Sequence, residues 1–160
     1  MSRIAEFARA SLEETLEQVA FAPVTVLDDA FDWSEGDLIW AEIALVSPIA
    51  GTLVFAGPRA TVQPLAADAW GGGTDADPGA AFLSEVANII AGQLLANLYP
   101  AREPGIGLPI FGAGARTVAR DALSLCVDVD VGRVGLLIEL DSQAPLAPSS
   151  PIYDATEGVV

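Results

Sequence analysis

The stretch AAFLSEVANIIAGQLLANL, residues 80–98, predicts one long amphipathic helix that ends near Tyr99 and Pro100. At 100° per residue, large hydrophobic side chains cover one broad side of this helix. They are Phe82, Leu83, Val86, Ile90 and Leu94. A second stripe falls within about 80° of arc on another side. It contains one acid, one amide and three small residues, namely Ala81, Glu85, Asn88, Gly92 and Ala96. The helix therefore has one face that can pack in a hydrophobic core and a second face that is not needed for that core.

This second stripe has two interpretations. Every amphipathic helix has a solvated face, on which Glu85 and Asn88 would be ordinary surface residues. Gly92 suggests something more, because glycine inside a helix destabilises it by about 1 kcal/mol relative to alanine. The gain in exchange would be clearance for another molecule or for a packed element of the same chain. Periodicity alone leaves both interpretations open.

The remainder of the chain predicts two more helices and six strands. The helices cover residues 4–20 and 59–70, and Pro64 is expected to kink the second or delay its start. The strands cover residues 24–27, 38–46, 52–56, 108–111, 123–131 and 134–140. A hairpin turn at 130–133 joins the last two. Residues 71–79 are expected to form a flexible break between two halves, and residues 102–107 a loop.

This order predicts an α+β (α/β two-layer) domain over residues 1–142. We expect a mostly antiparallel six-stranded sheet with about three helices on one side. Each half opens with a helix that leads into three strands, which predicts two pseudo-repeated α-β-β-β halves, although their sequences are too different to prove a repeat. Residues 143–160, rich in Pro, Ser and Ala, predict a flexible C-terminal tail.

The charge of the chain excludes several functions. Its 160 residues suit one domain, and the net charge is −15, with seven arginines and no lysine. Binding to nucleic acid or to an anionic membrane surface depends on basic side chains, so we expect neither. We find no secretory leader and no apolar run of about 18–20 residues, and therefore expect a soluble cytoplasmic protein.

Catalytic and metal-binding side chains are also limited. The absence of histidine excludes Ser–His and Cys–His nucleophiles. Cys126 is the single cysteine, expected to be a buried small hydrophobe, so no zinc cluster can form. The Gly112–Arg116 segment lacks the lysine and the strand–loop–helix pattern of a phosphate loop. Asp75 and Asp77 lack the spacing of a calcium-binding loop. We expect no metal or cofactor of the chain's own.

The run Glu85-Val-Ala-Asn88-Ile-Ile-Ala-Gly92 resembles the Glu-x-x-Asn-x-x-x-Gly signature of the CheC/CheX/FliY family of chemotaxis phosphatases. Residues 47–58, SPIAGTLVFAGP, resemble the strand–turn–strand before the family's middle helix, and residues 66–71 the end of that helix. Residues 105–114, GIGLPIFGAG, resemble the Leu-Pro strand and the glycine-containing loop after the signature helix. With the final hairpin, the resemblance covers residues 4–141.

This resemblance implies a phosphatase that hydrolyses the aspartyl phosphate of a response-regulator receiver of the CheY type, in two-component signalling. It implies that Glu85 pairs with the receiver's lysine, and that Asn88 enters the receiver's active site and orients the attacking water. Gly92 would keep the helix face low, with Ala81 and Ala96 as further partner-binding positions. Mg²⁺ would come with the receiver, so the chain needs no metal site.

The first helix departs from the family pattern. The CheC branch carries the signature twice, whereas here Glu13-x-x-Leu16-x-x-x-Ala20 has leucine in place of asparagine, and the register Glu14-x-x-Glu17 is no better. We therefore expect one site per chain, as in the CheX-like branch, whose homodimer formation is also an expectation for this chain. The alternatives are a non-catalytic receiver-binding or scaffold module of the same fold, and a plain structural domain.

Overall fold

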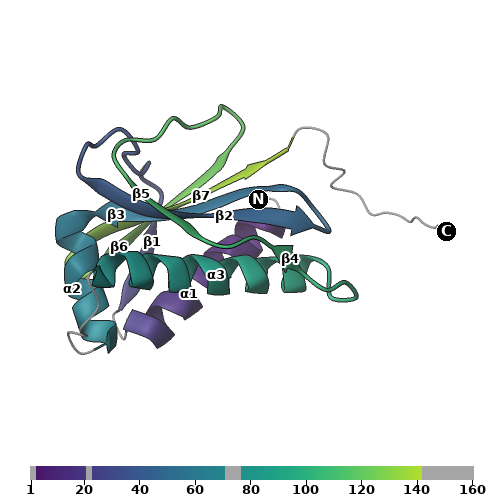
Figure 1. The fold of residues 1–160 in the computed structure, drawn as a ribbon, viewed down its shortest axis with the longest axis horizontal. Coiled ribbons are helices and arrows are strands. Elements are labelled where there is room, and N and C mark those ends of the chain that lie inside the picture. The colour runs from purple at the N-terminus through teal and green to yellow at the C-terminus, as the bar shows by residue number, and fades with distance from the viewer. Residues whose placement is uncertain (1–2, 21–22, 71–76, 142–160) are drawn as a thin grey trace.

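Three helices and seven strands make up the residues that the computed structural model describes, which are 3–20, 23–70 and 77–141. The helices are α1 (Arg3–Ala20), α2 (Arg59–Trp70) and α3 (Pro78–Leu98). The strands are β1 (Val24–Leu27), β2 (Leu38–Ser47), β3 (Gly51–Pro58), β4 (Gly105–Ile106), β5 (Ile110–Ala113), β6 (Leu123–Val129) and β7 (Gly132–Leu140). The three helices lie on one side of the sheet (Figure 1). The predicted two-layer α+β fold is confirmed.

The helix boundaries agree with the sequence patterns to within two residues. Pro64 lies inside α2, which begins at Arg59, so the proline does not delay the start of that helix. Asp77 caps α3, because its Oδ1 accepts a hydrogen bond from the Ala80 amide at 3.1 Å, and Pro78 occupies the first turn. The rest of the predicted break, residues 71–76, and the predicted tail, 143–160, lie outside the described residues.

The sheet is antiparallel throughout, in the order β1-β6-β7-β3-β2-β4, with β5 also paired to β2. Both β4 and β5 lie along the same edge of β2, so six positions across the sheet hold seven strands. The prediction of six strands with a loop over 102–107 was wrong here, since β4 falls inside that loop. Pro109, which has no N–H to donate, helps to divide this edge into two short strands.

The strand order confirms the two pseudo-repeated halves. The central pair joins the third strand of each half, β3 with β7. On one side β1 pairs with β6, and on the other side β2 pairs with β5, so the first strand of each half lies beside the second strand of the other. The arrangement has an approximate two-fold symmetry between β3 and β7, in which α1 and α3 occupy equivalent positions.

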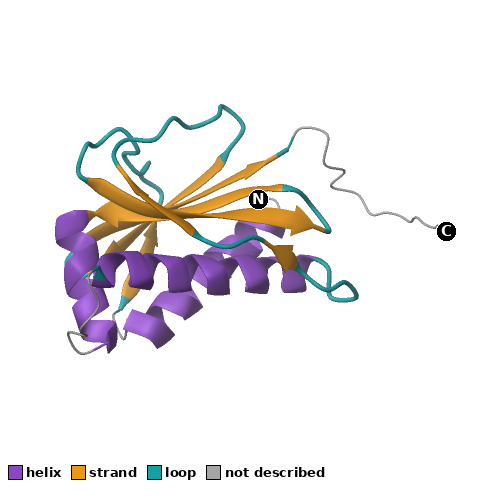
Figure 2. Ribbon diagram, viewed as in Figure 1, coloured by secondary structure: helices purple, strands orange, loops and turns teal. Residues whose placement is uncertain are grey.

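Helix α3 is the central helix of the core. Eight of its side chains are fully buried: Phe82, Leu83, Val86, Ala87, Ile90, Ala91, Leu94 and Leu95. They pack with residues of β2, β3 and α1 (Figure 2). Against the expectation that no segment is apolar enough, Gly79–Leu98 is long and apolar enough to cross a membrane, with a mean hydropathy of 1.4. Half of this window is buried inside the fold, as in the core helix of a globular domain.

Two long loops cover the other face of the sheet. They connect β1 to β2 and β5 to β6, so they are equivalent in the two halves, and they meet where the Arg116 amide donates to the Trp33 carbonyl at 2.8 Å. Beneath them lies a second hydrophobic cluster, made of Phe31, Trp33, Leu38, Val54, Ala56, Cys126 and Leu137. The predicted burial of Cys126 is confirmed.

Candidate functional site

The stripe predicted on the outer face of α3 lies away from the sheet. Glu85, Asn88 and Ala96 are exposed, and Ala81 and Gly92 are partly buried. The buried residues of the helix occupy the opposite side, as the 3.6-residue period requires. The packing of eight apolar side chains against the sheet fixes the rotation of α3 about its axis, and this rotation turns the stripe outward.

Glu85 and Asn88 stand nearly one turn apart on α3. Within residues 3–20, 23–70 and 77–141, neither side chain has a hydrogen-bond or ion-pair partner. Their carboxylate and carboxamide are therefore available to another molecule. A carboxylate accepts hydrogen bonds and attracts a cation, whereas a carboxamide both donates and accepts.

Gly92 has open space beside it. A Cβ atom built there would find nothing within 4 Å outside the helix's own backbone, whereas one built at Gly112 would overlap the ring of Trp40. Packing therefore explains the glycine at 112 and does not explain the one at 92. Gly92 was expected to leave room either for another molecule or for a packed element of the same chain. Among the described residues no element packs against Gly92, so the second expectation is wrong.

The equivalent face of α1 differs from the expected one. Leu16 is fully buried in the main core, so it does not stand on the outer face where a second asparagine would be, and the register through Glu13 and Leu16 was wrong. The exposed positions of this turn are Glu14, Glu17 and Gln18, while Glu13 is partly buried and lies 4.0 Å from Arg9. The outer face of α1 is acidic and carries no amide in the matching register.

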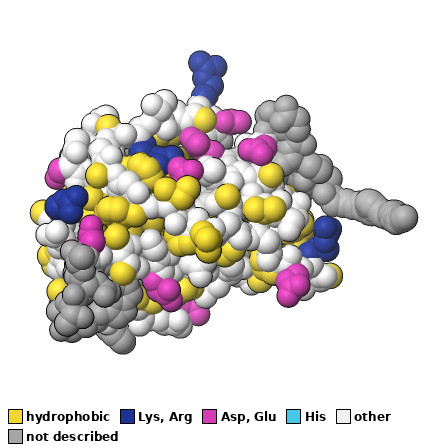
Figure 3. Space-filling model, viewed as in Figure 1, with side chains coloured by type: hydrophobic (Ala, Val, Ile, Leu, Met, Phe, Trp, Pro, Cys, Tyr) yellow, Lys and Arg dark blue, Asp and Glu magenta, His cyan; other side chains and the backbone are white. Residues whose placement is uncertain are grey.

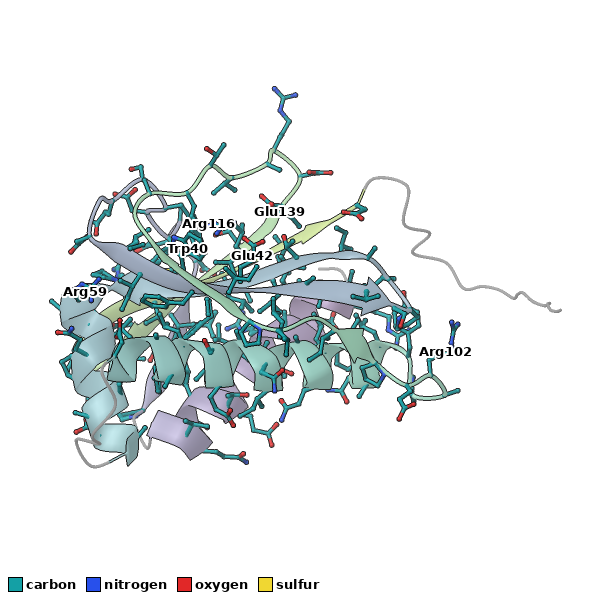
Figure 4. All side chains as sticks on the ribbon, in the orientation of Figure 1. Trp40, Glu42, Arg59, Arg102, Arg116 and Glu139 are labelled. Atoms are coloured by element: carbon teal, nitrogen blue, oxygen red, sulfur yellow. The ribbon has the colours of Figure 1, made fainter. Side chains whose placement is uncertain are left out.

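A cluster around Arg116 holds the β5–β6 loop to the sheet. Figure 4 shows Arg116 above the sheet together with Trp40 and Glu42. The guanidinium lies 4.3 Å from the centre of the Trp40 ring, and its Nη2 donates to Glu42 Oε1 at 2.7 Å. Gly114, at a φ of +104°, turns the chain just before it. This segment, considered above as a phosphate loop, has a structural role that periodicity did not predict.

Shifted pKa values occur in the loop-covered layer. The Ser34 hydroxyl and amide donate to Asp32 Oδ1 at 2.6 and 3.0 Å, and these bonds lower the pKa of Asp32. Burial raises the pKa of the Cys126 thiol, which makes it a poor nucleophile. In the described parts of the chain, no group of three or more His, Cys, Asp or Glu side chains could hold a metal ion.

Sequence reasoning also missed three exposed apolar side chains along the β4–β5 edge of the sheet. Residues 108–111 were predicted to be a strand, but Leu108 lies between β4 and β5 and is 88% exposed, and Ile110 and Phe111 are exposed as well. The signal that could have identified them is Pro109, because a proline within a strand pattern indicates the edge of a sheet.

Comparison with known proteins supports the fold resemblance. No family model and no curated protein matches the sequence. Among solved structures, chemotaxis protein CheX from Vibrio vulnificus has a TM-score of 0.69 at 13% identity, over 88% of this chain and 97% of that one. A CheC-like superfamily protein from Shewanella sp. PV-4 has a TM-score of 0.61 at 16% identity, over 89% and 100%. The CheX–CheY–BeF₃–Mg²⁺ complex from Borrelia burgdorferi has a TM-score of 0.63 at 18% identity, over 84% and 96%.

Proposed function

We propose that this chain, which has the fold of CheX- and CheC-like chemotaxis proteins, hydrolyses the aspartyl phosphate of a CheY-type receiver. The observation that carries the proposal is the pair Glu85 and Asn88, which stand together and without partners among the described residues on the outer face of α3. The sequence around this pair matches the signature of the resembled family. A similar fold has also been crystallised with CheY, BeF₃ and Mg²⁺.

In this proposal Glu85 and Asn88 have different roles. Glu85 pairs with a lysine of the receiver and holds it against α3. Asn88 enters the receiver's active site, and its carboxamide orients a water molecule in line with the bond to be broken. The water attacks phosphorus, the bond from phosphorus to the aspartate oxygen breaks, and the products are inorganic phosphate and the receiver's free carboxylate.

The chemistry requires little from the chain beyond positioning. An acyl phosphate is already activated, so an oriented water and a stabilised phosphoryl group suffice, without a histidine base. The Mg²⁺ that neutralises the phosphoryl oxygens belongs to the receiver. The small residues Gly92, Ala81 and Ala96 leave room for the receiver to approach the helix. The proposal also locates the chain in the cytoplasm, with its receiver.

The test is dephosphorylation of a panel of phosphorylated CheY-type receivers by the wild type and by Asn88→Ala. We expect the wild type to accelerate phosphate release from at least one receiver. Loss of one positioned hydrogen-bonding group should reduce that acceleration by about 10²-fold or more. Asn97→Ala is the matched control, since Asn97 is exposed on the same helix outside the stripe. Wild-type and Asn88→Ala rates equal to the receivers' own hydrolysis across the panel would contradict the proposal.

A receiver-binding module without turnover is the second candidate. It is favoured by α1, which keeps its place in the fold without an amide in the matching register. Capture of a phosphorylated receiver with no release of phosphate would support it over the phosphatase. A homodimer, as in the CheX-like branch, is part of the same proposal and is tested by sedimentation of the free chain.

A further inference from the structure

Glu85 is exposed, so an ion pair formed there would lie partly in water. Within residues 3–20, 23–70 and 77–141, its carboxylate has no hydrogen-bond or ion-pair partner. Ion pairs between exposed groups contribute little to binding, because water screens the two charges and competes for them. In the proposed function Glu85 must nevertheless hold the receiver's lysine. A neighbouring apolar side chain that excludes water would strengthen this pair.

Ile89 is the neighbour of Glu85 that can exclude water from it. On a helix, the neighbours of a residue lie three and four positions away, which here are Ala81, Phe82, Asn88 and Ile89. Ala81 is small, Asn88 is polar, and Phe82 is fully buried. All four lie in the described part of the chain. Ile89 is therefore the one large apolar neighbour on α3 that has exposed surface.

Helix geometry directs Ile89 toward the Glu85 carboxylate. The two residues are one turn apart, and at 100° per residue they are separated by about 40° around the helix axis. Helical side chains lean toward the N-terminus, so Ile89 leans over the turn that carries Glu85. Gly92 follows one turn later, and a Cβ atom there would meet nothing within 4 Å outside the helix's own backbone. A partner that uses this open space and reaches Glu85 passes over Ile89.

The hydrophobic core does not account for Ile89. Its side chain is partly exposed, and among the described residues it neither belongs to a hydrophobic cluster nor packs against one. Leu98, which is also partly exposed on α3, does pack against the main cluster. Figure 3 shows the face on which α3 lies, where hydrophobic side chains are exposed beside acidic ones. A single apolar residue on such a surface is ordinary, and Ile89 is distinguished by its place between Glu85 and Gly92.

We propose that Ile89 is a binding residue that acts through Glu85, an inference that rests on the proposed function of Glu85 and Asn88. The receiver's lysine lays its apolar stem against Ile89 and its ammonium group against the Glu85 carboxylate. Ile89 excludes water from this ion pair and so sets how tightly the receiver is held. The role of Asn88 with the attacking water does not depend on it.

The test compares Ile89→Gln with Ile89→Met. Glutamine and methionine have similar length and helix propensity, so the variants differ mainly in whether the side chain is apolar. The probe is the CheY-type receiver that binds the wild type most tightly in a panel activated with BeF₃ and Mg²⁺. In Ile89→Gln we expect Kd for this form, and KM for the phosphorylated form, to rise about tenfold, with kcat within about twofold of the wild type. Ile89→Met should keep both constants within about twofold. Equal constants for the two variants would overturn the inference.

A double-mutant cycle identifies the group through which Ile89 acts. Glu85→Gln should raise Kd by a factor about threefold smaller in the Ile89→Gln protein than in the wild type, because the ion pair it removes is already weakened by water. The same factor in both proteins would show that Ile89 does not act through Glu85, which also overturns the inference. Val118→Gln is the control, since Val118 is 37% exposed in the β5–β6 loop on the opposite face of the sheet. It should change neither Kd nor KM.

The outcomes separate this inference from the proposed function. Weaker binding of the activated receiver to Ile89→Gln than to Ile89→Met, together with no phosphate release by the wild type, supports the role of Ile89 and removes the catalytic proposal. Phosphate release by the wild type, with equal receiver binding by the two Ile89 variants, overturns the inference alone. If no activated receiver in the panel binds the wild type, both fall.

Discussion

Helices α1 and α3 occupy equivalent places in the two halves of the fold, yet their two sides have different compositions. On the inner side, α3 buries eight apolar residues, whereas α1 buries Ser11 and Thr15 among its alanines and leucines. On the outer side, α3 carries an acid, an amide and small residues, whereas α1 carries several glutamates. The repeated architecture fixes where each helix lies. It does not determine what the helix offers to a partner, so the two halves share a fold without sharing a site.

The largest expected effect on stability comes from Leu16, the residue of α1 that the motif register made equivalent to Asn88 of α3. Leu16→Asn should lower the free energy of unfolding by about 3–5 kcal/mol, because it removes a fully buried leucine and buries an amide without partners. Glu17→Asn, one position along and exposed, is the matched control and should change stability by less than about 0.5 kcal/mol. Urea unfolding measures both. Equal stabilities for the two variants would mean that Leu16 is not in the core.

The start of α3 provides a second, smaller test. Asp77→Ala removes the hydrogen bond to the Ala80 amide, and loss of such a cap lowers stability by about 1 kcal/mol. The change should speed amide hydrogen exchange in the first turn of α3 and leave α1 unaffected, which identifies the effect as local to one helix. Asp68→Ala, an exposed aspartate on α2, serves as the control and should change neither stability nor exchange.

The smallest effect, and the only stabilising one, is expected at Gly92. Because a Cβ atom meets nothing within 4 Å there, Gly92→Ala should raise the free energy of unfolding by about 0.5–1 kcal/mol through helix propensity. Gly92→Leu should fold as well but weaken receiver binding, since its side chain fills the open space. Gly79→Ala is the contrasting variant and should not raise the free energy of unfolding. Gly79 is buried, and a Cβ there would lie 3.2 Å from Ile39 Cδ1. A destabilised Gly92→Ala protein would show that the space beside this helix is occupied in solution.

Much of the fold could be predicted from the sequence because its signals are local. Apolar periodicity located all three helices, and β-branched runs located most strands. The hairpin between the last two strands was also correct, although its turn is shorter than the predicted 130–133, since Val129 pairs with Gly132 and Asp128 with Arg133. The repeat of a helix followed by three strands predicted two halves, which the strand order confirms.

The errors arise where the answer depends on distant parts of the chain. A two-residue strand such as β4 has no pattern of its own and is defined by its pairing with Leu45 and Ser47. The position of Leu16 was misjudged because the motif register outweighed the spacing of Ala8, Leu12 and Leu16, which puts all three on one buried side. The roles of Glu85 and Asn88 depend on a second molecule, so neither the sequence nor the fold of this chain can determine them. They remain predictions.

The alternation of strands from the two halves also governs when the chain can fold. Strand β1 has its partner in β6, where Val24 lies opposite Val129, and β3 is completed only by β7. Within the first half β2 can pair with β3, but β1 and the second edge of β3 have no partner until β6 and β7 have been synthesised. Contacts this distant in sequence make folding slow compared with that of a helical bundle of the same size. A fragment that ends after α2 would lack β6 and β7, which are the partners of β1 and β3. The two halves are therefore related in architecture, but they complete one another's sheet and fold together.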